Sequence, residues 1–592
     1  MKTIPALFLE QARIRPEKPG YYERIDGRWV PTSWKGYVDQ TRRAARAMIA
    51  LGMEPGDTVA ILGFNNAEWA IFDIASMCVG GAPAGIYTTC SPSEVSYIIG
   101  HAEAKLVLLE NKAQWEKVNA ERAKLPKLEH VIMMSKSEPI EDELVMTWEQ
   151  FMAKAEGTPE NVVDERVAAL ELAQLATLIY TSGTTGPPKG VMLSHENLAW
   201  TASCALSLTD VNEADWGISY LPLSHIAEQM FTLHIPLTSG ASVYFAESIE
   251  RLADNLKEVQ PTYFFGVPRI WEKIHAGIAG KLAGAPPMKK KLVTWAMGVG
   301  TEVSSYKALG KPLPFFTNLK YALANKLIFS KLKPAIGMGK LKIGVSAAAP
   351  ISREVLEFFA SLDLIVNEVY GQSEGSGPTT FNAPGAVRLG TVGQALPGVD
   401  LKIADDGEIL VKGPNVFLGY LKEEEATAET LNDGWLFSGD LGVLDDAGYL
   451  NITGRKKELI ITAGGKNIAP KNIEAALKNF DLITEAVVIG DRRKYLSALV
   501  CLEPEAAKRF AQENGLEVEN LHKAPKLTAE IQKIVDAINP EFARVEQIKR
   551  FVVLPRPLTV EDSELTPTLK VKRRVINEKY ADEIESMYLG AD

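Results

Sequence analysis

The segment Tyr180-Thr-Ser-Gly-Thr-Thr-Gly-Pro-Pro-Lys-Gly190 constrains the fold and the chemistry more than any other stretch. The apolar run before it, residues 176–180, predicts a strand, and Ser194 after it is a candidate helix N-cap. Glycines let the backbone bend closely around an anion, while hydroxyls, backbone N–H groups and the Lys189 ammonium supply donors and positive charge. A Walker A loop differs, because there Gly-Lys is followed by Ser or Thr. We expect a loop suited to the β- and γ-phosphates of ATP, with a plain Gly/Ser turn as the alternative.

Short apolar runs with β-branched residues alternate with helical stretches in the first half of the chain. The predicted strands are residues 58–64, 105–110, 130–134, 176–181 and 242–246, and Ser33–Leu51 is a predicted helix. This alternation predicts an α/β fold of parallel sheets covered by helices. From about residue 390 to 453, strand–turn–strand segments predict a smaller β-rich subdomain, and the chain then returns to an α+β pattern. We predict a large N-terminal domain over residues 1–454 and a small C-terminal domain over residues 458–592.

The bulk composition is that of an ordinary globular protein. The 592 residues are 46% apolar and 23% charged, with a net charge of −11 that argues against general nucleic-acid binding. Four dispersed cysteines form no metal-like or paired spacing, which favours a reduced, cytoplasmic setting. Glu10 and Arg13 interrupt any apolar run at the start, so we expect no signal peptide. The most apolar stretch, residues 69–87, is interpreted as buried core rather than a membrane span.

Residues 281–342 carry an unusual charge. They hold twelve lysines and one acid, Glu302, which gives 12 − 1 = +11 for this segment and −11 − 11 = −22 for the remainder. Trp295, Phe315, Phe316 and other aromatic residues lie among those lysines. Basic residues interleaved with aromatic ones suit the surface of an anionic membrane. The alternative is a solvated helical insertion whose aromatic rings pack inward.

Four further segments of the chain are rich in polar or small residues. They are Asn367-Glu-Val-Tyr-Gly-Gln-Ser-Glu374, Gly344-Val-Ser-Ala-Ala-Ala-Pro350, Gly434-Trp-Leu-Phe-Ser-Gly-Asp440 followed by Arg455, and Leu221-Pro-Leu-Ser-His-Ile-Ala-Glu-Gln229. Together with the loop at residues 180–190, they resemble the signatures of the adenylate-forming superfamily, which includes acyl-CoA synthetases, firefly-type luciferases and peptide-synthetase adenylation domains. The resemblance covers nearly the whole chain.

The resemblance implies a nucleotide site with defined roles. Tyr370 stacks on adenine, Asp440 and Arg455 hold the ribose, Ser373 contacts the α-phosphate, and Glu374 helps hold Mg²⁺. The superfamily usually has Thr where Ser373 stands, and the hydroxyl is kept. The predicted ATP-binding residues are Thr181, Ser182, Gly183, Thr184, Thr185, Gly186, Ala347, Ala348, Tyr370, Gly371, Gln372, Asp440 and Arg455, with Thr184 joining Glu374 at the metal.

The acyl group is expected beside the nucleotide. By resemblance, His225, Gly266 and Val267 line this pocket, with His225 at the carboxylate end. His225 and Glu228 lie three residues apart, but no third ligand or HExxH spacing accompanies them, so we do not expect a metal there. A structural core histidine is the alternative for His225.

The C-terminal segments imply a second half-reaction. By resemblance, Lys457 is the hinge residue of a junction at residues 455–457, and Gly464 and Gly465 form part of a pantetheine tunnel. Glu564-Leu-Thr-Pro-Thr-Leu-Lys-Val-Lys-Arg-Arg574 places Lys570 as the catalytic lysine, with Lys572 as the competitor. This form resembles the long-chain branch, and bubblegum-type acyl-CoA synthetases in particular.

The implied function is ligation of a long-chain fatty acid to coenzyme A. ATP and Mg²⁺ would support formation of an acyl-adenylate, and the predicted catalytic residues are Lys570, Glu374, Ser373 and Lys189. Three alternatives remain: an enzyme that loads a carrier protein, a luciferase-like oxygenase, and a catalytically silent nucleotide-binding or scaffold protein. We expect a cytoplasmic protein, and residues 281–342 offer a segment for peripheral contact with a membrane. The sequence does not reveal the oligomeric state.

Overall fold

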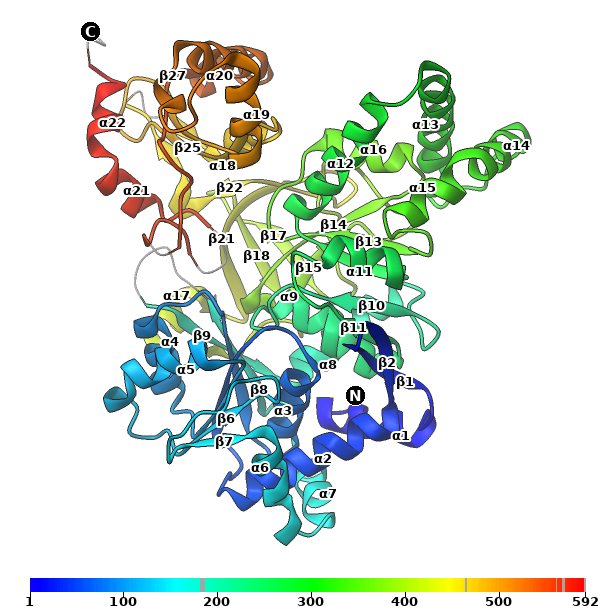
Figure 1. Ribbon diagram of the computed structural model, residues 1–592, viewed down its shortest axis with the longest axis vertical. Coiled ribbons are helices and arrows are strands. Elements are labelled where there is room, and N and C mark those ends of the chain that lie inside the picture. The colour runs from blue at the N-terminus through cyan, green and yellow to red at the C-terminus, as the bar shows by residue number, and fades with distance from the viewer. Residues whose placement is uncertain (182–186, 464–465, 561, 567–569, 590–592) are drawn as a thin grey trace.

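The chain folds into a large N-terminal body of several sheets and a smaller C-terminal body, as the computed structural model shows (Figure 1). The structure describes residues 1–181, 187–463, 466–560, 562–566 and 570–589. Within those ranges, none of the helices combines the length and apolar character needed to cross a bilayer. The predicted α/β class is confirmed by the layers of sheet and helix.

An eight-stranded sheet forms the largest layer, in the order β19-β9-β8-β4-β3-β5-β6-β7. Its strands are β3 (Thr58–Leu62), β4 (Ala82–Ile86), β5 (Leu106–Leu109), β6 (His130–Met133), β7 (Val145–Thr147), β8 (Leu175–Thr181), β9 (Lys189–Ser194) and β19 (Gly419–Tyr420). The strands from β8 to β7 are parallel, whereas β9 and β19 add antiparallel neighbours at one edge. The predicted strands here are confirmed, but residues 189–194 form a strand that the sequence analysis left unassigned.

Helices cover both faces of this sheet (Figure 1). They are α1 (Ile4–Ile14), α2 (Trp34–Ala50), α3 (Ala67–Cys78), α4 (Pro92–Ala102), α5 (Lys112–Ala120), α6 (Trp148–Ala153), α7 (Asn161–Ala168) and α8 (His195–Ser207). Ser33 caps α2 by accepting from Gly36 N at 3.2 Å, and Ser194 caps α8 by accepting from Asn197 N at 3.1 Å. Helix α3 is buried along its whole length, as expected for an apolar stretch inside a layered fold.

Two further sheets continue the N-terminal body. One has the order β10-β11-β1-β2 and the other β12-β13-β14-β15-β16. Their strands are β1 (Pro19–Ile25), β2 (Arg28–Ser33), β10 (Trp216–Ser219), β11 (Ser242–Phe245), β12 (Tyr263–Gly266), β13 (Ile343–Ser346), β14 (Val366–Gln372), β15 (Gly377–Phe381) and β16 (Gln394–Ala395). Helices α9 (Ile226–Gln229), α10 (Ile235–Ser239), α11 (Leu252–Val259) and α16 (Arg353–Ser361) accompany them.

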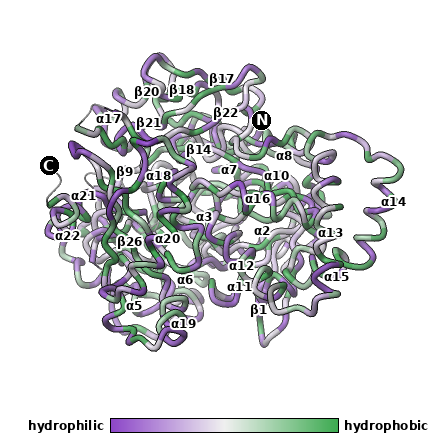
Figure 2. Tube along the Cα trace, turned by 90° about the horizontal axis from the view of Figure 1, so that it is seen from above, coloured by the Kyte–Doolittle hydropathy of each residue, from purple (hydrophilic) through white to green (hydrophobic). Residues whose placement is uncertain are grey.

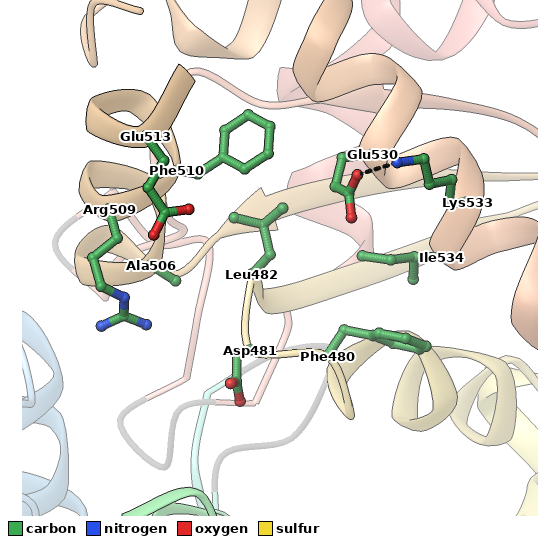
Figure 3. Close-up of a pocket in the computed structure, with 10 residues that line it drawn as sticks. All are labelled: Phe480, Asp481, Leu482, Ala506, Arg509, Phe510, Glu513, Glu530, Lys533 and Ile534. Atoms are coloured by element: carbon green, nitrogen blue, oxygen red, sulfur yellow. Dashed lines mark hydrogen bonds and ion pairs between the residues drawn. The ribbon is translucent and has the colours of Figure 1, made fainter. Parts of the chain in front are cut away.

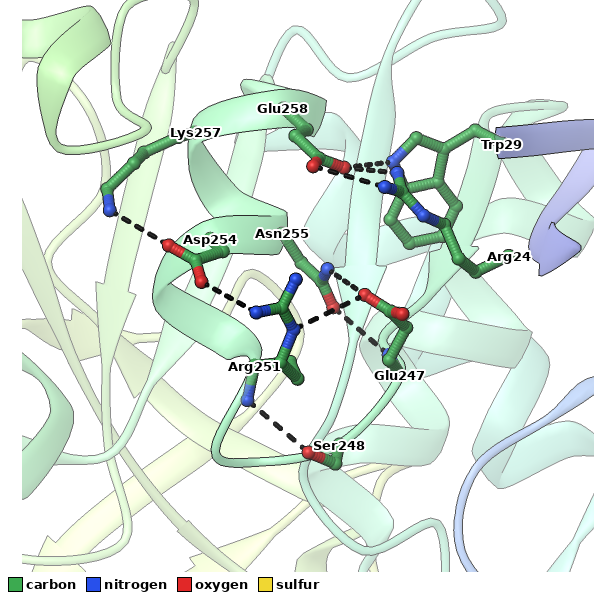
Figure 4. A network of polar contacts seen from close by, with 9 residues as sticks. All are labelled: Arg24, Trp29, Glu247, Ser248, Arg251, Asp254, Asn255, Lys257 and Glu258. Carbon is green, nitrogen blue, oxygen red and sulfur yellow. Dashed lines mark hydrogen bonds and ion pairs between the residues drawn. The ribbon is translucent and has the colours of Figure 1, made fainter. Parts of the chain in front are cut away.

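A polar network joins the β1–β2 hairpin to α11 (Figure 4). Glu258 on α11 accepts from Trp29 Nε1 at 3.0 Å and also from the guanidinium of Arg24. On the same helix, Asn255 Nδ2 donates to Glu247 at 2.7 Å. Because the Glu258 contacts lie at the surface, they orient the hairpin more than they stabilise the fold.

The predicted β-rich subdomain is confirmed. Strands β17 (Asp400–Ile403), β18 (Glu408–Lys412), β20 (Leu431–Asn432), β21 (Trp435–Leu444) and β22 (Leu450–Arg455) form an antiparallel sheet, with α17 (Glu424–Thr430) beside it. The C-terminal part then contains β23 (Ile460–Ile461) paired with β24 (Asn467–Ile468), and a sheet of β25 (Ile483–Ile489), β26 (Leu496–Leu502) and β27 (Ile548–Val553). Its helices are α18 (Pro470–Lys478), α19 (Pro504–Asn514), α20 (Pro525–Ile538), α21 (Arg573–Lys579) and α22 (Ala581–Ser586).

A helical arm projects from the N-terminal body and comprises residues 287–335. It follows α12 (Pro268–Ala283) and consists of α13 (Pro287–Lys307), α14 (Phe315–Ala324), a π-helical turn (Asn325–Phe329) and α15 (Ser330–Ala335). Two perpendicular views place α14 at the outer edge of the molecule (Figures 1 and 2). The arm has its own small core, which includes Val293, Val303, Ala324 and Phe329.

A buried carboxylate anchors the arm. Asp363, just after α16, keeps 3% of its side chain exposed and accepts from Lys307 and Lys333 at 2.6 Å each and from Tyr321 Oη at 2.7 Å. Burial alone would raise the pKa of Asp363, but the two lysines outweigh it and lower the pKa. The three donors come from α13, α14 and α15, so one carboxylate ties together all three helices of the arm.

Replacing Asp363 therefore tests the anchor. We expect Asp363→Ala to lower the free energy of unfolding by about 3–5 kcal/mol, because it leaves the partly buried Lys333 without its counter-charge. Asp39→Ala removes the exposed partner of Lys35 and should cost less than about 1 kcal/mol. Urea unfolding of both variants measures the difference; equal costs would contradict the anchoring role.

Candidate active site

The end of β14 places Tyr370 against the β-rich subdomain. Its hydroxyl donates to Asp440 Oδ2 at 2.9 Å, and burial together with the Asp440 charge raises the pKa of Tyr370. The next residue must be glycine, because a Cβ on Gly371 would lie 1.7 Å from the carbonyl oxygen of Gly377. Gln372 ends the strand, and Ser373 is buried in the short turn that follows. The predicted segment at residues 367–374 thus places the Tyr370 ring beside the Asp440 carboxylate.

Asp440 and Arg455 face each other across two strands. They are direct partners in the register of β21 and β22, and Arg455 Nε lies 3.5 Å from Asp440 Oδ1. Burial would lower the pKa of Arg455, but the charges of Asp440 and Glu458 outweigh burial and raise the pKa. A half-buried carboxylate with one phenol and one guanidinium beside it retains acceptor capacity for a ligand's hydroxyl groups.

Lys189 and Glu374 meet at a residue that the sequence analysis missed. Tyr420 Oη donates to Glu374 Oε1 at 2.7 Å, and Lys189 Nζ lies 4.9 Å from the centroid of the Tyr420 ring. Tyr420 belongs to β19, whose pairing with β9 brings it beside the loop-flanking strand. Thr181 faces Lys189 in the antiparallel pairing of β8 and β9, so the predicted phosphate loop connects these two strands. Ser182, Gly183, Thr184, Thr185 and Gly186 lie outside the described residues.

Several of the predicted site residues lie at one edge of the sheet that contains β12, β13 and β14. Strands β12, β13 and β14 are parallel, so their carboxyl ends, which lead to Val267, Ala347 and Tyr370, share one edge, where open α/β sheets bind ligands. These three side chains all pack against the main hydrophobic core. Ala348 adopts a left-handed φ of +72°, a strained conformation for a residue with a Cβ.

Gly266 allows a close approach at the end of β12. Trp271 Nε1 donates to its carbonyl oxygen at 3.0 Å, and a Cβ at this position would lie 2.9 Å from that indole nitrogen. A side chain at residue 266 would therefore displace a fully buried tryptophan. Val267 then serves as the N-cap position of α12.

His225 caps helix α9 through its ring. Its Nδ1 accepts from Ala227 N at 3.1 Å, so the neutral ring carries its proton on Nε2. Burial, with a smaller contribution from the Lys570 charge, lowers the pKa of His225 to about 4. A neutral imidazole that exposes an N–H donor suits contact with a carboxylate. The structural role as a cap and the predicted pocket role therefore use different ring nitrogens.

Glu228 serves a different network from His225. It accepts from Ser219 Oγ and Thr232 Oγ1 at 2.9 Å each and from Tyr220 N at 3.0 Å. Burial raises the pKa of Glu228 to about 7. Across the described ranges, no cluster of three or more His, Cys, Asp or Glu residues is arranged to hold a metal.

Lys570 lies between the two bodies of the protein. Its backbone N–H donates to Thr566 Oγ1 at 3.0 Å, and Thr566 N donates to the Lys570 carbonyl at 2.7 Å. The side chain keeps solvent exposure, yet atoms of both bodies crowd it. This desolvation, and then the charges of Arg455 and Lys471, lower the pKa of Lys570.

The two competing lysines face different surroundings. Lys570 is electrostatically coupled to Arg455, Asp440 and His225, all in the N-terminal body. Lys572 Nζ instead lies 4.0 Å from Glu94 Oε1 on α4. Of the two, Lys570 is the ammonium whose charge interacts with those of Arg455 and Asp440.

The junction between the bodies contains alternating charges. Lys457 is exposed in a short turn, while its neighbour Lys456 lies 2.6 Å from Asp406 and 3.0 Å from Glu408. On the other side, Glu458 lies 3.0 Å from Lys471. The predicted channel residues Gly464 and Gly465 lie outside the described residues.

A separate surface pocket lies in the C-terminal part (Figure 3). It encloses about 390 Å³ and is lined by residues of α19, α20 and the turn that precedes β25, including Phe480, Leu482, Phe510 and Ile534. Glu530 and Lys533 at its rim pair with each other at 2.8 Å. None of the predicted site residues lines it, so we assign the chemistry to the junction instead.

Comparisons with known proteins agree with this geometry. A family model described as AMP-binding enzyme matches residues 8–421, and one described as AMP-binding enzyme C-terminal domain matches residues 457–592. The long-chain-fatty-acid–CoA ligase ACSBG2 of Xenopus laevis is 38% identical, with 100% of this chain and 84% of that protein covered. The long-chain-fatty-acid–CoA ligase FadD15 of Mycobacterium bovis is 36% identical, with 99% and 97% covered.

Solved structures share the fold at lower identity. The crystal structure of the anthranilate CoA ligase AuaEII in complex with anthranoyl-AMP matches with a TM-score of 0.73 at 19% identity, covering 99% of this chain and 98% of that one. The o-succinylbenzoate CoA synthetase of Bacillus subtilis in complex with its acyl-adenylate matches with a TM-score of 0.69 at 20% identity, covering 97% and 98%. The expected fold class is confirmed by these matches.

A buried carboxylate supports the segment that carries Lys570. Glu564 has no exposed side-chain surface and accepts from Arg556 at 2.8 and 2.9 Å, Tyr580 Oη at 2.7 Å, Thr559 N at 2.9 Å and Lys579 at 3.0 Å. Burial would raise the pKa of Glu564, but these donors outweigh it and lower the pKa to about 2. Its backbone carbonyl also accepts from Lys572 N at 2.8 Å, which fixes the chain just after Lys570.

This network makes stability depend on pH. Because the folded-state pKa of Glu564 lies below its ordinary value of 4.5, its contribution is complete above about pH 5 and is lost as pH falls toward 2. We expect Glu564→Gln to cost about 1–2 kcal/mol at pH 7, after discounting for solvent screening, and much less near pH 2. Urea unfolding at several pH values, with the exposed Asp582→Asn as the control, measures this. A cost independent of pH would contradict the charge-based account.

Proposed function

The chain belongs to the AMP-binding enzyme family, and on that premise we propose that it is a long-chain fatty acid–CoA ligase. It activates a fatty acid with ATP to give an acyl-adenylate and pyrophosphate, and then transfers the acyl group to coenzyme A. The observation that carries the proposal is the contact of Tyr370 and Arg455 with Asp440, and the charge of Lys570 from the C-terminal part acts on this pair. Full-length similarity to proteins named long-chain-fatty-acid–CoA ligases supports the substrate class.

ATP binds with its ribose at Asp440. The carboxylate accepts hydrogen bonds from the two ribose hydroxyls, Arg455 steadies that carboxylate, and the Tyr370 ring stacks on adenine with Ala347 and Ala348 beside it. The hydroxyl of Ser373 contacts the α-phosphate. The loop at residues 181–186 and Lys189 hold the β- and γ-phosphates, because backbone donors and an ammonium both favour anions.

Glu374 is proposed to hold Mg²⁺, with Thr184 as a second ligand. A single carboxylate and a hydroxyl fit this ion, because protein sites commonly supply few ligands and leave the rest to phosphate oxygens and water. When bound, Mg²⁺ neutralises negative charge on the phosphates. Tyr420 donates to one oxygen of Glu374 and so orients the carboxylate for this task.

The first step joins the fatty acid to AMP. A carboxylate oxygen attacks the α-phosphorus, and the bond from this phosphorus to the oxygen bridging it to the β-phosphate breaks, releasing pyrophosphate. Lys570 places positive charge between the two anionic reactants and stabilises the pentavalent phosphate. His225 Nε2–H orients the carboxylate, while Gly266 and Val267 line the acyl pocket.

The second step requires a different arrangement. The CoA thiol attacks the acyl carbonyl and AMP leaves, so Lys570 must make room for the pantetheine arm. We place the domain division at residues 1–454 and 458–592, with a rotation about Lys457 that brings Gly464 and Gly465 to the channel. One contact that this rotation would break is the hydrogen bond from Arg269 Nη2 to Thr484 Oγ1, at 3.1 Å. We also infer a cytoplasmic enzyme that contacts a membrane peripherally.

A panel of acids tests the substrate class. We expect AMP formation with long-chain fatty acids to exceed that with acetate, benzoate or amino acids by at least about 100-fold in kcat/KM, because each buried methylene adds about 0.8 kcal/mol. Free CoA should be consumed in equal amount with AMP, measured as loss of free thiol. Activation of long-chain acids without CoA consumption would instead indicate loading of a carrier protein.

The role of Lys570 is tested by separating the two steps. We expect Lys570→Ala to lower the rate of acyl-adenylate formation about 10²–10³-fold, the usual cost of losing one charge-stabilising group. Thioester formation from supplied acyl-adenylate should change less than about threefold. Lys572→Ala is the matched control and should retain adenylate formation. Full adenylation by Lys570→Ala would show that the lysine is wrongly assigned.

A further inference from the structure

One face of α14 is apolar and unpartnered. Phe315, Phe316, Leu319 and Leu323 keep 78%, 74%, 64% and 50% of their surfaces exposed, and Leu327 continues the row with 38%. At 3.6 residues per turn these five residues occupy one side of the helix. Thr317, Ala324 and Ile328 lie on the opposite side and are buried. The helix therefore packs inward through its other side and leaves its most apolar face in solvent.

Lysines flank and interrupt this face. Lys326 falls within the apolar arc and Lys320 lies at its margin, while Lys311 precedes the helix and Lys331 lies in α15. For Lys311, Lys326 and Lys331, no ion pair to a described residue is present, and all three are exposed. Phenylalanine and leucine side chains beside unpaired ammonium groups make a surface that is apolar and cationic at once.

A second exposed stripe lies at the start of α13. Met288 is 84% exposed, and Leu292 and Trp295 follow at helical spacing with 38% exposed each. Lys289, Lys290 and Lys291 are all exposed between them. The same combination of apolar and cationic side chains thus occurs twice in the arm.

The segment that contains the arm, residues 281–342, has a charge opposite to that of the rest of the molecule. Residues 281–342 carry a net charge of +11, and the remainder carries −22. An anionic surface would attract the arm and repel the other faces, which fixes the orientation of approach. A neutral apolar partner would gain no electrostatic attraction from this separation of charge.

The arm is also well attached to the body. Its inner side packs on its own core, and Asp363 binds one side chain from each of α13, α14 and α15. Two perpendicular views place α14 at the periphery of the molecule (Figures 1 and 2).

We propose that the helical arm is a docking surface for an anionic phospholipid bilayer. The Phe315, Phe316, Leu319 and Leu323 side chains enter the interfacial region, and the surrounding lysines bind lipid phosphates and headgroup carboxylates. Helix α12 connects Val267 directly to this arm, so docking brings the bilayer to the part of the molecule that leads to the acyl pocket. Only that last consequence rests on the proposed function; the docking itself does not.

Sedimentation with vesicles tests the proposal on the full-length protein. We expect binding to vesicles of equimolar phosphatidylcholine and phosphatidylglycerol, and little binding to phosphatidylcholine alone. Lys311→Gln, Lys326→Gln and Lys331→Gln combined should weaken binding about 100-fold, because each lysine near an anionic surface contributes roughly a factor of five. The exposed lysines Lys112, Lys136 and Lys154, changed to Gln together, are the matched control and should lose less than about threefold.

The apolar face needs its own variant. Phe315→Ser combined with Phe316→Ser should weaken binding at least about tenfold. Ile249→Ser, at another exposed apolar residue, is the control and should have no effect. Hydrolysis of ATP to AMP with a water-soluble acid and CoA, without vesicles, should stay unchanged in all these variants, which separates docking from catalysis.

Insertion can be read directly at α14. All four cysteines of the chain are buried, so Leu319→Cys offers a single exposed thiol for an environment-sensitive fluorophore. Its emission should shift to the blue on adding anionic vesicles, whereas a label at Val518→Cys should not respond. The proposal fails if neither double nor triple variant weakens vesicle binding, or if Phe315→Ser with Phe316→Ser converts a dimer to a monomer while vesicle binding persists.

Discussion

The Asp440–Arg455 pair across β21 and β22 is the contact on which the site depends. It lies where the β-rich subdomain meets the end of β14, so Tyr370 can donate to the same carboxylate. Arg455 is also the last residue of its strand, immediately before the junction with the C-terminal part. One ion pair therefore connects the nucleotide site to the point where the two bodies join. Any movement of the C-terminal part must begin beside the group that holds the ribose.

The charges around Lys570 explain why we expect this lysine to hold its present position in only one arrangement of the two bodies. The lysine is desolvated and lies near Arg455 and Lys471, two like charges that lower its pKa and make its present position costly without a ligand. Anionic phosphates would relieve that repulsion, and their departure as pyrophosphate would restore it. On the proposed mechanism, the chemistry itself supplies a driving force for the C-terminal part to leave after the first step. Glu564, with its five donors, keeps the Lys570 segment in shape during such a movement because the network lies wholly within the C-terminal part.

The arm and the site use charge in opposite ways. In the site, single ammonium and guanidinium groups are matched to nearby carboxylates or to expected phosphates. In the arm, most lysines have no acidic neighbour, since residues 281–342 include one acid among twelve lysines. Unpaired charge beside exposed phenylalanines is unfavourable in a free protein and favourable at an anionic surface. The −22 carried by the rest of the molecule restricts such binding to this one surface.

The sequence by itself determined the features that depend on neighbouring residues. It predicted the strand before the phosphate loop, the Ser194 cap, the α/β layers and the β-rich subdomain, because periodicity, capping and turn chemistry act within a few residues. It also supplied the site residues through resemblance, although their roles stay predictions. Only the tertiary structure decided which side chains meet. Tyr420 reaches Glu374 because β19 pairs with β9, and residues 189–194 form a strand by joining an edge of the sheet. The sequence also did not decide whether the apolar face of α14 is exposed, since it allowed the aromatic rings to pack inward. These outcomes depend on pairing and packing between residues distant along the chain, for which local propensity carries no information.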